Sequence, residues 1–174
     1  MTQQQREITE HTEFMREALQ EAQLSLDEGE FPVGCVFVAK GEIVARGRRC
    51  NSSEVNRNEI DHAEITTLRL LIKQQNKIPM HDVSVYSTME PCLMCYSTML
   101  LSGIRTFVWS YEDVMGGGTN LSLTDLNPLY AAMNVQTIGA VLRKDSLALF
   151  QEFFKEHSYW QDSLLSKYTL EQSV

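Results

Sequence analysis

The sequence predicts an α/β fold, a three-layer sandwich in which a mixed β-sheet is flanked by helices. Segments with helical periodicity alternate along the chain with short apolar segments typical of strands. In the second half, single strands and helices alternate, which implies parallel neighbouring strands connected by helices. The chain has 174 residues without an internal repeat, low-complexity tract or linker, so we expect a single domain over residues 1–174.

The first half of the chain is expected to contain a helix, a hairpin and a second helix. Residues 10–28 form an amphipathic helical pattern in which apolar side chains recur every four positions. Residues 31–39 are almost entirely apolar, which favours a strand buried on both faces. A turn then predicts an antiparallel strand over residues 42–50. A polar loop over residues 51–61 precedes a helix that begins at His62.

The second half is expected to alternate strands with helices and to end in a helical tail. Its glycine-rich segment, residues 115–120, predicts either a mobile lid or a tight turn. The expected elements are strands over residues 82–87, 104–110 and 135–142, and helices over residues 91–102, 125–133, 146–157 and 158–174.

Composition and charge favour a protein of the cell interior and weigh against a polyanionic partner. The net charge is −8 and the densest basic spot is only Arg46-Gly-Arg48-Arg49, whereas nucleic-acid binders usually show a basic face. The N-terminus has no signal-peptide core, and no apolar run approaches the about 18–20 residues of a membrane span. We therefore expect a cytoplasmic protein without membrane contact, whose cysteines are thiols or metal ligands.

The stretch Glu90-Pro-Cys-Leu-Met-Cys95 places two cysteines three residues apart behind a proline. Proline suits the first position of a helix, and residues i and i+3 share one helix face. Cys92 and Cys95 are therefore expected to point the same way from a helix N-terminus, where the helix dipole favours thiolates. Two thiolates can bind a metal, but they need at least one more ligand.

His62, at the start of the helix after the hairpin, is the candidate for the third ligand. One imidazole and two thiolates leave the fourth position of a zinc ion open for water, which is the catalytic pattern. Zinc lowers the pKa of bound water from about 16 to about 7. Glu64 would then carry a proton from that water to a leaving group without binding the metal. We expect one zinc ion per chain.

Each of these features taken alone has a plainer interpretation. A C-x-x-C sequence also occurs in redox motifs and as half of a structural zinc site, although this one lies mid-chain and not after the first strand. A structural site needs a fourth ligand. The spare cysteines, Cys35 and Cys50, lie within or at the end of apolar strands, where a thiol usually belongs to the core. The two motifs together predict a catalytic zinc site.

His62-Ala-Glu64 and Glu90-Pro-Cys-Leu-Met-Cys95 resemble the H-x-E…P-C-x-x-C signature of the cytidine-deaminase-like zinc deaminases. The resemblance covers about residues 14–113 and is strongest to the branch that contains tRNA adenosine deaminases and bacterial guanine deaminases. Further similar stretches are Phe31-Pro-Val-Gly34, Asn51, His62-Ala-Glu-Ile-Thr-Thr-Leu-Arg69 and Ile104-Arg105.

This resemblance implies a fold, a reaction and an assembly. The family fold is a five-stranded sheet between helices, and its members are usually dimers or larger, so we expect a homodimer. His62, Cys92 and Cys95 match the family's zinc ligands. The implied reaction is hydrolytic deamination, in which zinc-bound hydroxide attacks the ring carbon bearing an exocyclic amine, Glu64 shuttles the proton and ammonia leaves.

The candidates for binding the substrate are Asn51, Asp61, Asp113 and Trp160. Asn51 matches an asparagine that hydrogen-bonds the base in related enzymes, although a loop Asn also caps turns. Asp61 would orient His62, bind the substrate or cap the helix, and we favour the cap. Asp113 begins a segment that is only loosely similar to the corresponding family loop. Trp160 would close over a small substrate, or pack in the core or a dimer interface.

Two departures from the family pattern bear on the substrate. Tyr96-Ser97-Thr98 follow the second cysteine where tRNA adenosine deaminases carry small residues, and the tail lacks their basic helix. We therefore expect a zinc-dependent hydrolase of amidine C–N bonds that deaminates a free nucleobase or nucleoside, with a purine such as guanine or adenine favoured. The alternative is a tRNA adenosine-to-inosine deaminase, so RNA stays a candidate partner. A non-catalytic zinc-stabilised interaction module is more remote, because such a site has no use for Glu64.

Overall fold

The computed structural model describes residues 3–55, 57–74 and 78–173. Its centre is a five-stranded sheet in the order β2-β1-β3-β4-β5. The strands are β1 (Gly34–Ala39), β2 (Glu42–Arg48), β3 (Val83–Met89), β4 (Thr106–Tyr111) and β5 (Gln136–Ile138). β1 is antiparallel to β2 and to β3, whereas β3, β4 and β5 are mutually parallel. The predicted mixed sheet is confirmed.

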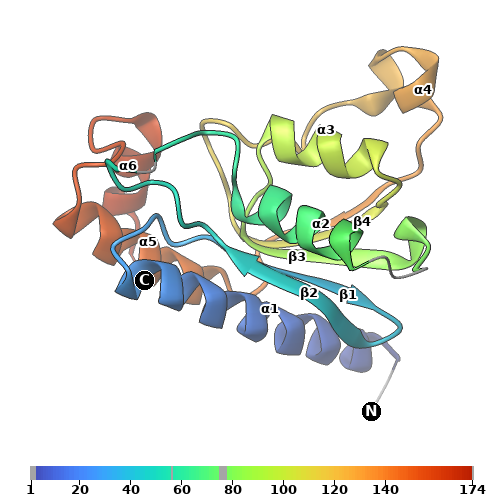
Figure 1. The fold of residues 1–174 in the computed structure, drawn as a ribbon, viewed down its shortest axis with the longest axis horizontal. Helices are drawn as coiled ribbons and strands as arrows, with labels where there is room; N and C mark the ends of the chain where they lie inside the picture. The colour runs from blue at the N-terminus through green and yellow to red at the C-terminus, as the bar shows by residue number, and fades with distance from the viewer. Residues whose placement is uncertain (1–2, 56, 75–77, 174) are drawn as a thin grey trace.

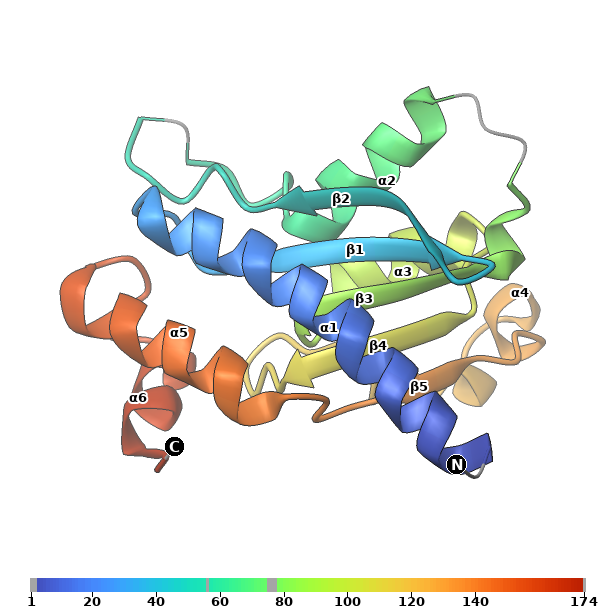
Figure 2. The ribbon, with the colours of Figure 1, turned by 90° about the horizontal axis from the view of Figure 1, so that it is seen from below.

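Helices cover both faces of this sheet, as Figures 1 and 2 show. α1 crosses one face with α5 beside it, α2 and α3 lie on the opposite face, and α6 packs against α5. The helices are α1 (Gln3–Asp27), α2 (Ala63–Lys73), α3 (Leu93–Leu101), α4 (Pro128–Ala131), α5 (Arg143–Glu156) and α6 (Leu164–Glu171), with short 3-10 turns η1 (Met80–Asp82) and η2 (Leu123–Asp125). Among the described residues, none of the helices has the length and apolar character to cross a membrane.

β1 is buried along its whole length, which confirms the strand predicted to be buried on both faces. Its side chains alternate between two layers of the core. Val36 and Val38 pack with Met15 of α1 in the smaller cluster. Cys35 and Phe37 belong to the larger cluster, which also contains side chains of α2, α3 and α5. The alternation explains the three-layer arrangement.

Three elements of the second half are shorter than the sequence predicts, and one of them is the tail helix expected over residues 158–174, which spans only Leu164–Glu171. The strand expected over residues 135–142 ends at Ile138, because Ala140 and Leu142 adopt left-handed backbone angles, with φ of 64° and 53°. The helix expected over residues 125–133 is divided into η2 and α4. Pro128 opens α4, and the residue before a proline is disfavoured in helical geometry. The spacing of apolar residues does not predict such local changes of backbone direction.

Cys50 is a further correction. The sequence predicts strand up to this residue and favours a core position for its thiol, but β2 ends at Arg48 and Cys50 is exposed. Cys35, in contrast, is fully buried in β1. The difference arises because the pairing of β2 with β1 ends at Arg48, so Cys50 lies beyond the strand.

Candidate active site

The candidate metal ligands lie at the starts of α2 and α3, which begin at the same end of the sheet (Figure 1). His62 is the N-cap residue of α2 and Cys92 is the N-cap residue of α3, each with an extended backbone. Pro91 was expected to open α3, but the helix begins two residues later at Leu93. The Cys95 side chain follows in the first turn of α3 and is fully buried.

The donor atoms of these three residues fit a zinc ion. Nδ1 of His62 lies 3.5 Å from Sγ of Cys92 and 3.5 Å from Sγ of Cys95. All three donor atoms lie within 4.8 Å of one another. A tetrahedral zinc with Zn–S of about 2.3 Å and Zn–N of about 2.0 Å separates such ligands by about 3.5 Å. Within the described residues, no fourth side chain joins this group, so the set matches the open catalytic pattern.

The electrostatics of the two sulfurs favour thiolate at Cys92. A hydrogen bond from Cys95, together with one from His62, lowers the pKa of Cys92 to about 4. The same hydrogen bond and burial raise the pKa of Cys95. The starts of α2 and α3 point their positive dipole ends at this charge. Because the thiolate is the metal-binding form of cysteine, the site is ready for a divalent cation.

Glu64 lies in the first turn of α2 and is almost completely buried beside the ligands. Its Oε1 accepts a hydrogen bond of 3.3 Å from the Ser87 hydroxyl at the end of β3, and its Oε2 lies 3.6 Å from Sγ of Cys95. Burial raises the pKa of Glu64 above its usual range. A carboxyl group with a raised pKa next to a metal site is suited to taking up and releasing a proton.

The glycine-rich segment packs against the Cys92 loop. The amide of Leu93 donates to the carbonyl of Gly116, and the amide of Gly118 donates to the carbonyl of Pro91. A Cβ at Gly118 would lie 2.7 Å from the Cα of Leu93, so only glycine permits this approach. Glu90 holds the segment from below by accepting hydrogen bonds from Thr119. The sequence predicts either a mobile lid or a tight turn for this segment, and its close packing fits the tight turn.

A cavity of about 250 Å³ opens in front of the ligands and Glu64. Most of its wall is apolar and comes from distant segments, namely Phe31, Val33, Ala63, Met89, Met94 and Leu165. Asp113 and Trp160, both predicted to bind the substrate, also line it. Oδ1 of Asp113 accepts backbone hydrogen bonds from Met115 and Gly116, and burial raises the pKa of this carboxyl group. Trp160 is 41% exposed, at the rim.

The structure does not bring Asn51 or Asp61 into the lining of this cavity. The amide of Asn51 accepts a hydrogen bond from Nε of Arg49 and donates one to the carbonyl of Asn58. The carboxylate of Asp61 pairs with Arg69 on the surface. His62, and not Asp61, is the N-cap residue of α2, so the helix-capping role favoured for Asp61 is wrong.

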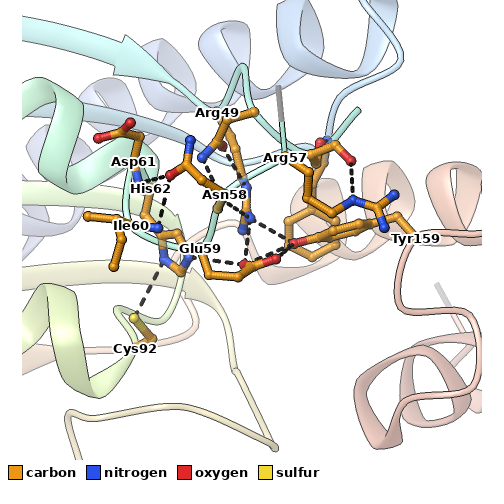
Figure 3. Close-up of polar contacts among 12 residues, drawn as sticks. Arg49, Arg57, Asn58, Glu59, Ile60, Asp61, His62, Cys92 and Tyr159 are labelled. Atoms are coloured by element: carbon orange, nitrogen blue, oxygen red, sulfur yellow. Dashed lines mark hydrogen bonds and ion pairs between the residues drawn. The ribbon is translucent and has the colours of Figure 1, made fainter. Parts of the chain in front are cut away.

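Sequence interpretation missed a polar cluster on the cavity wall, which is shown in Figure 3. The guanidinium of Arg49 donates to Glu59 at 2.8 Å and to the Tyr159 hydroxyl at 2.7 Å, and the Tyr159 hydroxyl also contacts Glu59 at 2.9 Å. All three residues line the cavity. Arg49 had been noted only as part of a basic spot. No local pattern links these residues, because Tyr159 lies far along the chain.

Three comparisons with known proteins agree with this geometry. Residues 8–111 match the family described as the cytidine and deoxycytidylate deaminase zinc-binding region. The tRNA-specific adenosine deaminase of Streptococcus pyogenes serotype M18 is 32% identical over 149 residues, covering 86% of this chain and 92% of that protein. A solved tRNA:A34 deaminase, from work on A-to-I editing at the wobble position of transfer RNA, superposes with a TM-score of 0.63 at 26% identity, covering 79% of this chain and 99% of that chain.

The guanine deaminase of Nitrosomonas europaea has the same fold, with a TM-score of 0.63 at 19% identity over 80% of this chain and 81% of its own. The family match confirms the predicted zinc cofactor, for which the three ligand side chains are in position. The chain therefore belongs to the cytidine and deoxycytidylate deaminase zinc-binding family and is a zinc-dependent hydrolase of the deaminase class.

Proposed function

We propose that this chain deaminates adenosine in tRNA, the activity that was the alternative in the sequence interpretation. The observation that carries the proposal is the similarity to tRNA-specific adenosine deaminases along nearly their whole length, at 32% identity over 149 residues. The free nucleobase or nucleoside favoured from the sequence has weaker support, because the guanine deaminase resembles this chain only in fold.

In the proposed reaction, His62, Cys92 and Cys95 hold zinc, which supplies a Lewis acid that activates water. Glu64 takes the proton released by that water and delivers it to the departing amine, so ammonia leaves as a neutral molecule. Its burial suits this role, since burial raises the pKa of the Glu64 carboxyl group and makes it a better proton acceptor than an exposed one. Ser87 fixes one carboxyl oxygen so that the other faces the ligands.

Asp113 and Trp160 are the substrate contacts that the geometry supports. Trp160 offers an aromatic face at the rim on which a base stacks, and Asp113 offers a carboxyl group on the cavity wall. Asn51 and Asp61 stay predictions with less support, because Arg49, Asn58 and Arg69 already occupy their side chains.

Deamination of a free base or nucleoside is a second candidate, and one observation favours it. The basic spot found in the sequence is neutralised by neighbouring acids. Arg46 pairs with Glu17 at 3.2 Å and Arg48 pairs with Glu28 at 2.7 Å. Paired arginines offer less attraction to RNA phosphates than free ones.

A substrate panel tests the proposal. The purified zinc-loaded chain is given tRNA, an anticodon stem-loop with adenosine at the wobble position, and the free bases and nucleosides of adenine, guanine and cytosine. We expect inosine in the RNA substrates and a rate that falls steeply with added salt, because RNA binding releases counterions. Faster, salt-insensitive ammonia release from a free base or nucleoside than from RNA would contradict the proposal and support the second candidate.

Three further expectations stay predictions: one deaminase domain over residues 1–174, assembly as a homodimer and a cytoplasmic location. Light scattering of the purified chain checks whether it is a homodimer. Several large apolar side chains are exposed on α2 and α3 and fit a partner surface, namely Leu70, Ile72, Leu93 and Leu101.

A further inference from the structure

The two ring nitrogens of His62 have very different surroundings. Nδ1 faces the sulfurs of Cys92 and Cys95 at 3.5 Å each. Nε2 is buried and makes no hydrogen bond with the described residues. When Nδ1 binds a metal, the neutral ring carries its proton on Nε2, and that N–H is a donor that needs an acceptor.

Glu59 supplies the nearest carboxylate. Its Oε2 lies 3.7 Å from Nε2 of His62, as the dashed line in Figure 3 shows. This carboxylate is not free to turn away, because Arg49 donates to Oε2 at 2.8 Å and the Tyr159 hydroxyl contacts both oxygens at 2.9 and 3.1 Å. Asp61, for which orienting His62 was one of three candidate roles, is paired with Arg69 instead.

Arg49 is itself held firmly, which makes the whole arrangement rigid. Its side chain is only 5% exposed, and its guanidinium lies 5.6 Å from the ring centre of Phe31 and 5.4 Å from that of Tyr159. Asn51 accepts a further hydrogen bond from its Nε. A chain of contacts therefore runs from the C-terminal segment through Tyr159 and Arg49 to Glu59 and the ring of His62.

We propose that Glu59 is a positioning residue for the zinc site, in which its carboxylate accepts the Nε2–H of His62 and fixes the orientation and tautomer of this ligand. Metal-binding histidines generally donate their other N–H to such an acceptor, and loss of the acceptor costs about 10- to 100-fold in metal affinity. The inference rests on His62 as a zinc ligand and is independent of the base that is deaminated. Arg49 and Tyr159 act through Glu59.

The test compares Glu59 with a matched control glutamate. Glu112 has the same kinds of partners, Arg143 and the Tyr168 hydroxyl, but among the described residues its carboxylate oxygens contact none of the candidate ligands. The variants are Glu59→Gln, Glu59→Ala, Glu112→Gln and Glu112→Ala. Zinc affinity is measured by competition with a chromophoric chelator, and the His62 Nε2–H resonance is followed by NMR of the zinc-loaded, ¹⁵N-histidine-labelled protein.

We expect Glu59→Ala to weaken zinc binding about 10- to 100-fold and to lose the slowly exchanging Nε2–H resonance. Glu59→Gln should retain more affinity, because its amide oxygen can still accept the bond. Both Glu112 variants should bind zinc like the parent and keep the resonance. Tyr159→Phe removes one of the bonds that hold Glu59 and should give a smaller loss of affinity.

Three results would overturn the proposal, and they have different meanings. Zinc affinity and an Nε2–H resonance unchanged in Glu59→Gln and Glu59→Ala would remove Glu59 from the zinc site and leave the ligand set intact. A parent chain that binds no stoichiometric zinc would overturn the ligand assignment as well. Equal weakening in the Glu59 and Glu112 variants would show a general loss of stability and also contradict a positioning role.

Discussion

At the scale of single residues, Glu64 is the side chain on which the proposed chemistry depends. It lies buried beside the ligands, and burial raises the pKa of its carboxyl group, which fits the proposed role of proton carrier. Glu64→Gln keeps the size and the hydrogen bond to Ser87 but removes the acidic proton. We expect this variant to bind about one zinc per chain and to lose deamination by about 10²-fold or more.

The measurement for Glu64→Gln is metal content by atomic emission together with ammonia release. Glu112→Gln is a suitable control because its carboxylate is bound to Arg143 and Tyr168, away from the cavity lining. Turnover at the parent rate by Glu64→Gln would assign the proton transfer to another group.

A second prediction at this scale concerns Cys92, one of the two ligands at an N-cap position. Cys92→Ala removes one sulfur from a set of three donors, and the two remaining side chains should hold zinc too weakly to copurify. We expect loss of both zinc and activity. Cys50→Ala is the control, because this exposed thiol lies outside the group and should change neither. Stoichiometric zinc in Cys92→Ala would exclude Cys92 as a ligand.

At the scale of elements, the site depends on how closely the glycine-rich segment approaches the start of α3. A Cβ at Gly118 would meet the Cα of Leu93 at 2.7 Å and its amide nitrogen at 2.9 Å, and neither backbone atom can move without shifting Cys92. The prediction is that Gly118→Ala loses about 1–3 kcal/mol of folding stability through overpacking and binds zinc more weakly than the parent.

Gly41→Ala separates this steric effect from a general cost of replacing glycine. Apart from its two chain neighbours, none of the described residues has a heavy atom within 4 Å of a Cβ at Gly41, so the penalty there arises from the positive φ of 77° in the hairpin turn. Urea unfolding should show a loss in both variants, but zinc affinity should fall only in Gly118→Ala. Parent-like zinc affinity in Gly118→Ala would mean that the segment does not constrain Cys92.

At the scale of the whole molecule, carboxylates that are buried or half-buried tie distant segments together and make the fold sensitive to acid. Burial alone raises the pKa of Glu30, but hydrogen bonds from Ser52 and Ser53 outweigh it and hold the pKa below its ordinary value of 4.5. At Glu112, Arg143 and Tyr168 outweigh burial in the same way. The folded chain therefore binds these protons more weakly than the unfolded chain.

These lowered pKa values determine how the stability of the fold depends on pH. The contribution of such a carboxylate is fully present above about pH 4.5, its unfolded pKa, and is lost as the pH falls through the lower folded pKa. We expect the free energy of unfolding to decline with acidification in this window. The double variant Glu30→Gln, Glu112→Gln should be less stable at neutral pH and show a flatter decline. Urea titrations at a series of pH values measure the stability at neutral pH and its decline with acidification. A decline as steep as that of the parent would contradict the assignment of Glu30 and Glu112 as groups that cause it.

The sequence by itself determined the chemistry and most of the architecture. Helix and strand periodicity predicted the mixed sheet and its flanking helices, because burial imposes the period of each element on the chain directly. The i, i+3 spacing of Cys92 and Cys95 predicted that both sulfurs share one helix face, and His62 and Glu64 at the start of another helix added a third ligand and a proton carrier.

Only the tertiary structure decided which side chains surround that site. The contact between Glu59 and Tyr159 joins residues whose separation along the chain is 100, and it depends on how α5 and α6 pack beside the cavity. This contact also holds the Glu59 carboxylate, which lies 3.7 Å from Nε2 of His62, whereas Asp61 pairs with Arg69. Local spacing fixes the direction of a side chain, but its partners across the fold are set by the packing of whole elements, which no short stretch of sequence encodes.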